Sequence, residues 1–265
     1  MAFTVEVERA DRVPARPASV VGVDVGVSHL AVLSTGELVP NPRHLEAAQA
    51  CLRRLGRALA RKQGPDPRTK QQPSKRWRRA AARLGRAHAR VGNQRRDGLH
   101  KLTTRLAAEH GTIVVEDLNV AGMFANRRLA RRIADAGFGQ IRRQLAYKTV
   151  WHGGRLVVAD RWYPSSKTCS ACGAVRAKLA LAERIYTCTS CGLTLDRDVN
   201  AARNLAALAA NAAEVRSAGS GPVAGRGANH KTRTRGQEAT KRQPGTTATA
   251  AGKTGTAAPQ GAAAA

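Results

Sequence analysis

Four of the five cysteines in this 265-residue chain form two Cys-x-x-Cys pairs that are fifteen residues apart. The pairs are Cys169 with Cys172 and Cys188 with Cys191. Two residues between thiolates let a tight turn aim both sulfurs at one ion, and a second pair completes a tetrahedral zinc site. Disulfides are the alternative, but the first residues lack the basic start and apolar core of a secretory signal, so reduced thiols are expected. The spacing therefore predicts one structural zinc ion with four cysteine ligands.

The chain is strongly basic, with 45 Lys and Arg residues against 18 acidic ones and a formal net charge of +27. Such an imbalance concerns partners rather than fold, and nucleic acid is the favoured polyanion. No apolar segment approaches the roughly 20 residues that span a bilayer, so no membrane partner is expected. We predict a cytoplasmic, nucleoid-associated protein that binds nucleic acid. Its oligomeric state is left open.

Residues 20–39 are predicted to form a buried strand, a turn with glycine and a second strand in a hairpin. Asp24 lies inside the first apolar strand, where a carboxylate is costly unless a positive group satisfies it. It is either a hydrogen-bonded structural residue at a strand end or a ligand presented to a metal. A third interpretation is the phosphate loop of an actin-like sugar kinase or ATPase, in which Asp-x-Gly also occurs. The positive charge and the cysteine pairs argue against that interpretation.

Two basic helices are predicted at about 44–62 and 74–110, separated by a segment with two prolines. Residues 51–110 hold 18 basic and three acidic side chains, a net charge of +15. Basic residues recur along one face of the second helix at helical spacing, and they are Arg76, Arg79, Arg83, Arg86 and Arg90. A solvated face is the alternative, but no acids alternate with these arginines, so contact with a nucleic-acid backbone is favoured. Cys51 stands alone on the first helix and is expected to be a core thiol.

Further acids stand at two later places in the chain. Glu116 and Asp117 end an apolar strand, and the carboxyl end of a strand is a favourable edge for a site in an α/β sheet. One of them could simply cap the next segment, and Asn119 can shape the turn; we favour Glu116 for chemistry and Asp117 for support. Asp196 and Asp198 precede an Ala- and Leu-rich helix, where an acid suits the helix dipole. Capping explains one member of that pair and not both.

Three acids, namely Asp24, Glu116 and Asp198, could crowd into one site only if cations neutralised them. Two Mg²⁺ or Mn²⁺ ions about 3.5–4 Å apart would do so, and would activate water for phosphodiester hydrolysis. Carboxylate oxygens are ligands that Mg²⁺ prefers. A zinc ion closed by four sulfurs has no open position for catalysis. Its expected role is to fix the short connection that carries Asp198.

Three motifs and the cysteine spacing resemble the TnpB family of transposon-encoded, RNA-guided DNA endonucleases. This family has long been labelled OrfB-type transposases and is related to compact type V CRISPR nucleases. The motifs are Gly22-Val-Asp-Val-Gly26, Ile113-Val-Val-Glu-Asp-Leu-Asn119 and Asp196-Arg-Asp-Val-Asn-Ala-Ala-Arg-Asn204, and the resemblance runs from about residue 3 to residue 208.

The resemblance implies an α/β fold with an RNase H-like (RuvC) mixed sheet, and metal-dependent hydrolysis of DNA by Asp24, Glu116 and Asp198. Asp198 is preferred to Asp196 because the family's acid directly precedes the x-Asn-Ala-Ala run. Asp196 and Asn200 are then supporting residues, together with Asp117 and Asn119. DNA and a guide RNA are the implied partners, and the basic helical insertion would lie along their duplex.

The implied domain organisation has five parts. They are a remnant of an N-terminal wedge-like lobe with a linker at 1–19, the nuclease core at 20–168 with its helical insertion at 44–110, the zinc ribbon at 169–191, the last RuvC motif and helix at 192–211, and a disordered basic tail at 212–265. Family members carry an N-terminal lobe that reads the target-adjacent motif, whereas here Asp24 lies 23 residues from Met1. We therefore expect a truncated copy. It is either an active endonuclease or a catalytically silent nucleic-acid-binding remnant or regulator.

Overall fold

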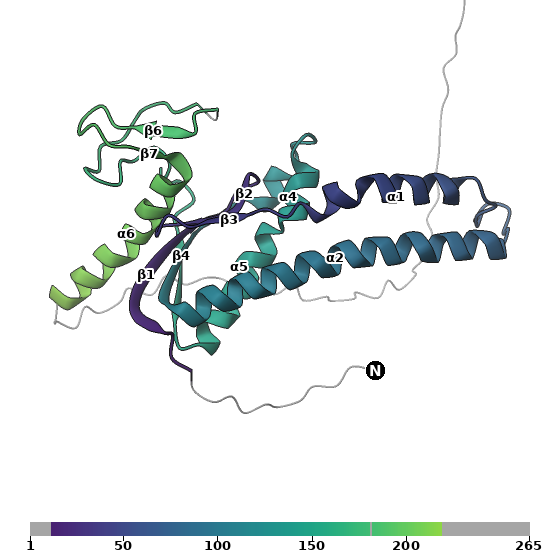
Figure 1. Ribbon diagram of the computed structural model, residues 1–265, viewed down its shortest axis with the longest axis horizontal. Helices are drawn as coiled ribbons and strands as arrows, with labels where there is room; N and C mark the ends of the chain where they lie inside the picture. Colours follow the sequence, from purple (N-terminus) through teal and green to yellow (C-terminus); the bar gives the residue numbers. More distant parts are fainter. Residues whose placement is uncertain (1–11, 181, 219–265) are drawn as a thin grey trace, which may run out of the picture. The chain divides into compact units, whose positions relative to one another are not determined.

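A mixed five-stranded sheet organises the computed structural model, which describes residues 12–180 and 182–218, with side chains described to residue 210 (Figure 1). The strand order is β3-β2-β1-β4-β5. The strands are β1 (Arg16–Asp24), β2 (His29–Leu33), β3 (Leu38–Pro40), β4 (His110–Glu116) and β5 (Arg155–Ala159). β1, β4 and β5 run parallel, whereas β2 and β3 are antiparallel additions beside β1. The predicted mixed α/β sheet is confirmed.

Six helices and a small hairpin complete the described part of the chain. The helices are α1 (His44–Ala60), α2 (Lys75–Glu109), α3 (Val120–Met123), α4 (Ala130–Ala136), α5 (Phe138–Trp151) and α6 (Arg197–Ala218), and the hairpin pairs β6 (Ile185–Thr187) with β7 (Thr194–Asp196). α1 and α2 match their predicted ranges to within two residues. α2 begins where the Ser74 side chain accepts a hydrogen bond from the backbone N–H of Trp77 at 3.1 Å.

The two ends of the chain are only partly described. Of the predicted N-terminal remnant, residues 12–19 are described, and β1 already begins at Arg16. Residues 212–218, predicted as the start of the tail, instead continue α6. The rest of both predicted segments, 1–11 and 219–265, lies outside the described residues.

α1 and α2 lie side by side as a helical hairpin (Figure 1). Leu52 of α1 and Val91 of α2 are buried. The arginines predicted to share one face of α2 are all exposed, and they are Arg76, Arg79, Arg83, Arg86 and Arg90. The expectation that Cys51 is a core thiol is wrong: its side chain is exposed, because Cys51 precedes Leu52 on a helix that buries only one narrow face.

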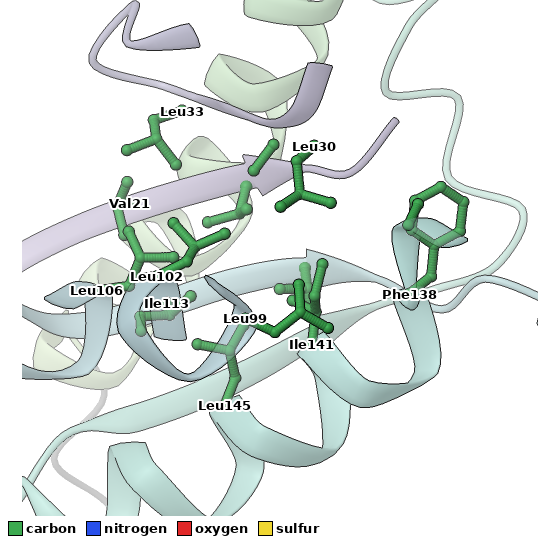
Figure 2. Close-up of a cluster of buried hydrophobic side chains, with 14 of the residues drawn as sticks. Val21, Leu30, Leu33, Leu99, Leu102, Leu106, Ile113, Phe138, Ile141 and Leu145 are labelled. Atoms are coloured by element: carbon green, nitrogen blue, oxygen red, sulfur yellow. The ribbon is translucent and has the colours of Figure 1, made fainter. Parts of the chain in front are cut away.

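The main core lies between one face of the sheet and the helices α2 and α5 (Figure 2). Its centre is made of Val21 and Val23 from β1, Ile113 from β4, leucines from both helices, and Phe138 from α5. The opposite face of the sheet is covered by α6, whose Leu205 and Ala209 pack on Val114. Because helices cover both faces, the central strands are continuous apolar runs rather than alternating ones.

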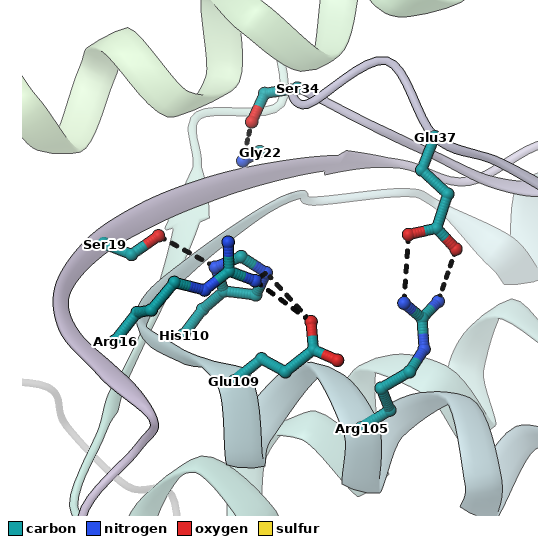
Figure 3. Close-up of polar contacts among 8 residues, drawn as sticks. All are labelled: Arg16, Ser19, Gly22, Ser34, Glu37, Arg105, Glu109 and His110. Atoms are coloured by element: carbon teal, nitrogen blue, oxygen red, sulfur yellow. Dashed lines mark hydrogen bonds and ion pairs between the residues drawn. The ribbon is translucent and has the colours of Figure 1, made fainter.

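Polar contacts tie the end of α2 to the start of β1 and to the turn between β2 and β3 (Figure 3). Arg105 donates to both carboxylate oxygens of Glu37, at 2.6 and 2.9 Å, and Arg16 pairs with Glu109 at 3.1 Å. These pairs are largely exposed, so each contributes little to stability. Packing in the main core therefore sets the position of α2, and the ion pairs neutralise charges near its end.

Gly22 sets the distance between β1 and α6. A Cβ atom at this position would lie 1.9 Å from the carbonyl oxygen of Ala202 and 2.7 Å from the nitrogen of Ala206. Both atoms belong to the α6 backbone, which cannot move aside without moving the helix. The absence of a side chain thus lets α6 cross β1 at a point two residues before Asp24 and one helical turn after Asp198.

We expect Gly22→Ala to destabilise the protein by about 1–3 kcal/mol, the usual range for overpacking. Gly85→Ala is the matched control, because an added Cβ meets nothing within 4 Å on the exposed side of α2. That change should stabilise the helix by about 0.5–1 kcal/mol. Urea unfolding measures both. Equal stabilities of the two variants would contradict the close crossing of β1 and α6.

Candidate functional site

The three predicted acids meet at one edge of the sheet. β1 ends at Asp24 and the neighbouring parallel strand β4 ends at Glu116, with Val23 and Val115 paired just before them. Asp198 is the second residue of α6, the helix that crosses β1. The carboxyl ends of parallel strands share an edge, and ligands commonly bind there. Segments far apart in the sequence thus bring three carboxyl groups to one place.

The charge state of Asp24 reflects this arrangement. Burial raises the pKa of the Asp24 carboxyl well above its ordinary value of 3.8, and the negative charges of Glu116 and Asp198 raise it further. The positive charge of Arg197 opposes the rise. Such a shift shows that the carboxyl groups lie within electrostatic reach of one another in a poorly solvated place. A carboxylate in such a place is stabilised when it binds either a proton or a metal cation.

Arginines hold Asp198 in the described structure. Arg197 lies 3.3 Å and Arg184 lies 3.7 Å from its carboxylate oxygens. Asp196 has a different role, because its Oδ1 accepts hydrogen bonds from the backbone N–H groups of Asp198 at 2.9 Å and Val199 at 3.1 Å. Asp196 therefore caps the start of α6, and the side chain of Asp198 is left to face the other acids.

Glu116 and Asp117 also separate into two roles. The hydroxyl of Ser165 donates a short hydrogen bond to Glu116, which keeps that carboxylate near the acidic edge. Asp117 instead pairs with Arg161 at 2.7 Å and with Arg142. Hydrogen bonding from Arg161 and then from Arg142 lowers the pKa of Asp117. Asp117 thus joins α5 to the segment after β5, and its predicted supporting role stays a prediction.

Asn119 shapes the turn after β4. Its side chain accepts a hydrogen bond from the backbone N–H of Gly122 at 3.0 Å and so caps the short helix α3. This contact agrees with the turn role that the sequence favoured for an asparagine at this place. The contact joins Asn119 to the turn itself and not to any of the three acids.

The four predicted cysteines form a compact group. Their sulfurs lie within 4.8 Å of one another, with Cys169 3.6 Å from Cys191 and Cys172 3.6 Å from Cys188. A disulfide has a length of about 2.05 Å, so these are free thiols. Zinc–sulfur bonds of about 2.3 Å in a tetrahedron place sulfurs about 3.8 Å apart. The group can therefore hold a metal ion such as zinc.

Both cysteine pairs sit on the same kind of turn. The backbone N–H of Gly173 donates to the carbonyl of Cys169 at 2.9 Å, and that of Gly192 donates to the carbonyl of Cys188 at 3.0 Å. Each glycine has a positive φ, 75° and 74°, which other residues adopt rarely. The backbone N–H groups of Cys191 and Ser190 lower the pKa of the Cys188 thiol to about 6. The turn at Cys188 thus favours the thiolate form of that residue, which is the form that binds metal. Hydrogen bonding among the clustered thiols instead raises the pKa of Cys172 and of Cys191.

Two buried asparagines of α6 fasten this cysteine ribbon to the acidic edge. The side chain of Asn200 accepts from the N–H of Ser170 at 3.0 Å and donates to the carbonyl of Thr168 at 2.7 Å. Asn204 donates to the carbonyls of Thr168 and Ser165, at 2.6 and 2.7 Å. Asn200 was predicted as a supporting residue and Asn204 was missed. The sequence signal that could have identified Asn204 is its position four residues after Asn200, which puts both side-chain amides on one face of the helix.

Within the described ranges, the cysteines are the one group of three or more His, Cys, Asp or Glu side chains whose ligand atoms lie within 4.8 Å of one another. The carboxyl groups of Asp24, Glu116 and Asp198 are near enough to interact electrostatically but are spread more widely. Arg197 lies among them and partly balances their charge.

Comparison with known proteins agrees with this arrangement. A family of transposon proteins, OrfB_IS605, described as "Probable transposase", matches residues 2–127, and the TNB domain of Cas12f1-like proteins matches residues 138–205. A Streptomyces pristinaespiralis protein named "Putative RNA-guided DNA endonuclease" is 46% identical over 201 residues, which are 75% of this chain and 48% of that protein. The chain belongs to the TnpB-like family. The Escherichia coli K12 relative InsQ, which bears the same description, is 35% identical over 77% of this TnpB-like chain and 53% of its own length.

The TnpB-like chain spans about half the length of these curated relatives. Its fold is similar to that of Cas12f1, solved by cryo-electron microscopy as a complex with sgRNA and target DNA. The TM-score is 0.51 at 16% identity, over 77% of this chain and 52% of that one. Likeness at this level of identity concerns the fold. None of the helices in the described part of the TnpB-like chain is long and apolar enough to cross a membrane.

Proposed function

We propose that this chain is a transposon-associated DNA endonuclease with an RNase H-like (RuvC) core, which hydrolyses phosphodiesters at a target chosen by a guide RNA. The observation that carries the proposal is the meeting of Asp24, Glu116 and Asp198 at one sheet edge, where the pKa of Asp24 is raised by burial and by its neighbours. The names of the relatives support the choice of DNA as substrate. Acting on DNA, the protein would work at the nucleoid, in the cytoplasm.

The three carboxylates have the chemistry of a site for two Mg²⁺ or Mn²⁺ ions. Hard oxygen donors, crowded negative charge and low solvation all favour a divalent cation over bare carboxylates. When bound, such ions activate a water molecule and stabilise the leaving oxygen of a phosphodiester. Ser165 holds Glu116 by a hydrogen bond, and Asp196 fixes the helix start that carries Asp198. Arg197 balances the acids while they carry charge.

The cysteine group is proposed to hold one structural zinc ion. Four sulfurs fill a tetrahedral site and leave no position for substrate. The turn that carries Cys169 and Cys172 is bonded to Asn200, which lies two residues after Asp198 on α6. Zinc would thus keep the third acid in place without taking part in the reaction. As part of the same unit, the ribbon would lie next to the nucleic acid that enters the site.

The arginine face of α2 is proposed to follow the nucleic-acid backbone. Arg76, Arg79, Arg83, Arg86 and Arg90 are exposed, and within the described residues no acidic side chain pairs with them. Uncompensated charge on one helix face favours phosphate contacts, since each contact releases condensed counterions. The guide RNA paired with target DNA is the proposed partner for this face.

Replacing Arg79, Arg83, Arg86 and Arg90 together by Gln should weaken DNA binding and lower its salt dependence. Each phosphate contact contributes about 0.9 to the slope of log K against log salt concentration, so the slope should fall by about 3 to 4. Arg105→Gln is the control for losing an arginine of α2, because Arg105 is already paired with Glu37 at 2.6 Å. Fluorescence anisotropy over a salt series measures both. An unchanged slope in the fourfold variant would remove α2 from the interface.

A second candidate is a nucleic-acid-binding protein that does not cleave. The observation that favours it is the pairing of Asp198 with Arg184 and Arg197, which holds a proposed metal ligand in ion pairs. Cleavage and binding assays on single-stranded and double-stranded DNA, each with and without RNA, distinguish the two candidate functions. Cleavage that appears only when Mg²⁺ or Mn²⁺ is added supports the endonuclease. Tight, salt-sensitive binding without cleavage under every condition supports the second candidate.

A further inference from the structure

Trp162 is the most exposed large apolar side chain in the described part of the chain, with 85% of its surface accessible. Its backbone is nevertheless firmly held. The N–H of Trp162 donates to Oδ1 of Asp160 at 2.8 Å, and the N–H of Tyr163 donates to the carbonyl of Asp160 at 3.1 Å. The next side chain, Tyr163, turns inward and packs on the cluster under α6. A rigid turn therefore presents an indole ring to solvent.

An open hollow of about 460 Å³ lies beside this ring. Trp162 lines it together with Asp117, Arg142, Val158, Asp160 and Arg161. Two arginines and two aspartates balance in charge, and both arginines are already paired with Asp117. A phosphate group would find no uncompensated cation here. An uncharged, flat, partly polar group would find an aromatic face and hydrogen-bonding side chains.

The hollow adjoins the acidic edge of the sheet. Ala159 of β5 is paired with Glu116 of β4, and Trp162 follows Ala159 by three residues. On the other side of the turn, Ser165 donates its hydroxyl hydrogen bond to Glu116. Adding the strand spacing to three residues of extended chain puts the Cα atom of Trp162 within about 16 Å of that of Glu116. A strand whose backbone passes the three acids can reach the ring.

We propose that Trp162 and its charge-balanced hollow stack an unpaired nucleobase of the strand that runs past Asp24, Glu116 and Asp198. The inference rests on the proposed function and deepens it, because it makes a single strand the form of nucleic acid at the acidic edge. Aromatic side chains bind bases of any sequence, since every base has a π face. The chain has a net charge of +27, so its many basic side chains attract the phosphate backbone of the nucleic acid at other places. The charge-balanced hollow at Trp162 is therefore suited to binding the uncharged base.

The test compares Trp162→Ala and Trp162→Phe with the unchanged zinc-loaded protein, and no Mg²⁺ or Mn²⁺ is added. The probes are a fluorescently labelled single-stranded oligodeoxynucleotide and an oligomer of equal length and charge in which every base has been removed. Trp162→Ala should weaken binding of the normal strand about 5- to 160-fold, the range that alanine substitution gives for one stacked base. Its effect on the abasic strand should stay below about twofold. Trp162→Phe should retain most of the affinity.

Trp151→Ala is the matched control, because Trp151 is a partly exposed tryptophan that packs on Tyr147 at the end of α5. Trp151→Ala should change the affinities for the normal strand and the abasic strand by the same factor. Equal weakening of both strands by Trp162→Ala, or no weakening, would overturn the stacking proposal. Because binding is measured without added divalent metal, this outcome is independent of cleavage. A protein that never cleaves but shows the expected base dependence would refute the endonuclease and keep the stacking site.

Discussion

Asp24→Asn should reduce metal-dependent DNA cleavage at least about 100-fold while leaving DNA binding intact. A bound divalent ion contributes several kcal/mol to the stabilisation of a phosphodiester transition state, and about 2.7 kcal/mol corresponds to 100-fold in rate. Asparagine keeps the shape of the side chain but supplies no negative charge for the ion. The measurement is a time course of cleavage with Mg²⁺ and with Mn²⁺, beside anisotropy for binding. Asp97→Asn, which removes an exposed acid of α2 paired with Lys101, should cleave normally.

The same substitution should stabilise the zinc-loaded protein when no Mg²⁺ is present. Burial raises the pKa of Asp24 in the folded chain above its unfolded value near 3.8. A raised carboxyl pKa contributes stability that is fully present below the unfolded pKa and is lost as pH rises through the folded pKa. The wild-type chain loses this contribution progressively as pH rises above the unfolded pKa, and asparagine, which does not titrate, avoids the loss. The advantage of Asp24→Asn should therefore shrink as pH is lowered from 8 toward 5.

Urea unfolding across that pH range measures the effect, with chelators omitted so that the cysteine ribbon keeps its metal. Added Mg²⁺ supplies a further comparison, since a ligand that binds the folded state raises its stability. Mg²⁺ should raise the stability of the wild-type chain and leave Asp24→Asn unchanged. A variant that cleaves at the wild-type rate, or that is less stable than wild type at pH 8, would be inconsistent with Asp24 in a crowded acidic site.

Much of the fold could be predicted from local patterns. The apolar runs that became β1, β4 and β5 are short and bounded by turn residues, and the helices α1 and α2 are separated by a proline-rich break. Local signals of this kind fix where elements begin and end. They do not fix that β1 pairs with β4 across more than 80 residues, because register depends on packing that no single segment contains. That pairing, with the crossing of α6 at Gly22, is what assembles the acids.

Sequence patterns gave candidate residues for the site but not their contacts. Cysteine spacing alone located the four sulfurs that can hold a metal ion, since the distance between thiolates is set by a local turn. The sequence could not show that Asp196 caps α6 while Asp198 faces the other acids. Two acids before a helix are equally good candidates for the cap until the first residue of the helix is known. Arg184 and Arg197 were not predicted to contact Asp198, as arginine is common throughout this basic chain. Cys51 was misplaced because cysteine is usually buried, whereas α1 has only one covered face.

Cys188→Ser should have the largest effect on stability among single substitutions in the described chain. Structural zinc contributes an apparent ~10–16 kcal/mol in small modules, and the Cys169–Cys191 ribbon has few apolar side chains of its own to replace it. Serine is a poor zinc ligand, so the ribbon should lose its metal and its order. Disorder should spread through Thr168, whose carbonyl accepts from both Asn200 and Asn204, to the start of α6. Cleavage should then be lost because Asp198 is no longer held beside Asp24.

Zinc content per chain, thermal unfolding and hydrogen exchange of residues 165–204 measure these consequences in turn. Exchange should rise in the ribbon and the first turns of α6, while the core between the sheet, α2 and α5 stays protected, because its side chains do not contact the cysteines. Cys51→Ser is the matched control: it removes an exposed thiol on α1 and should leave zinc content, stability and cleavage unchanged. A Cys188→Ser chain that is free of zinc and yet fully active would show that the ribbon does not position the third carboxylate.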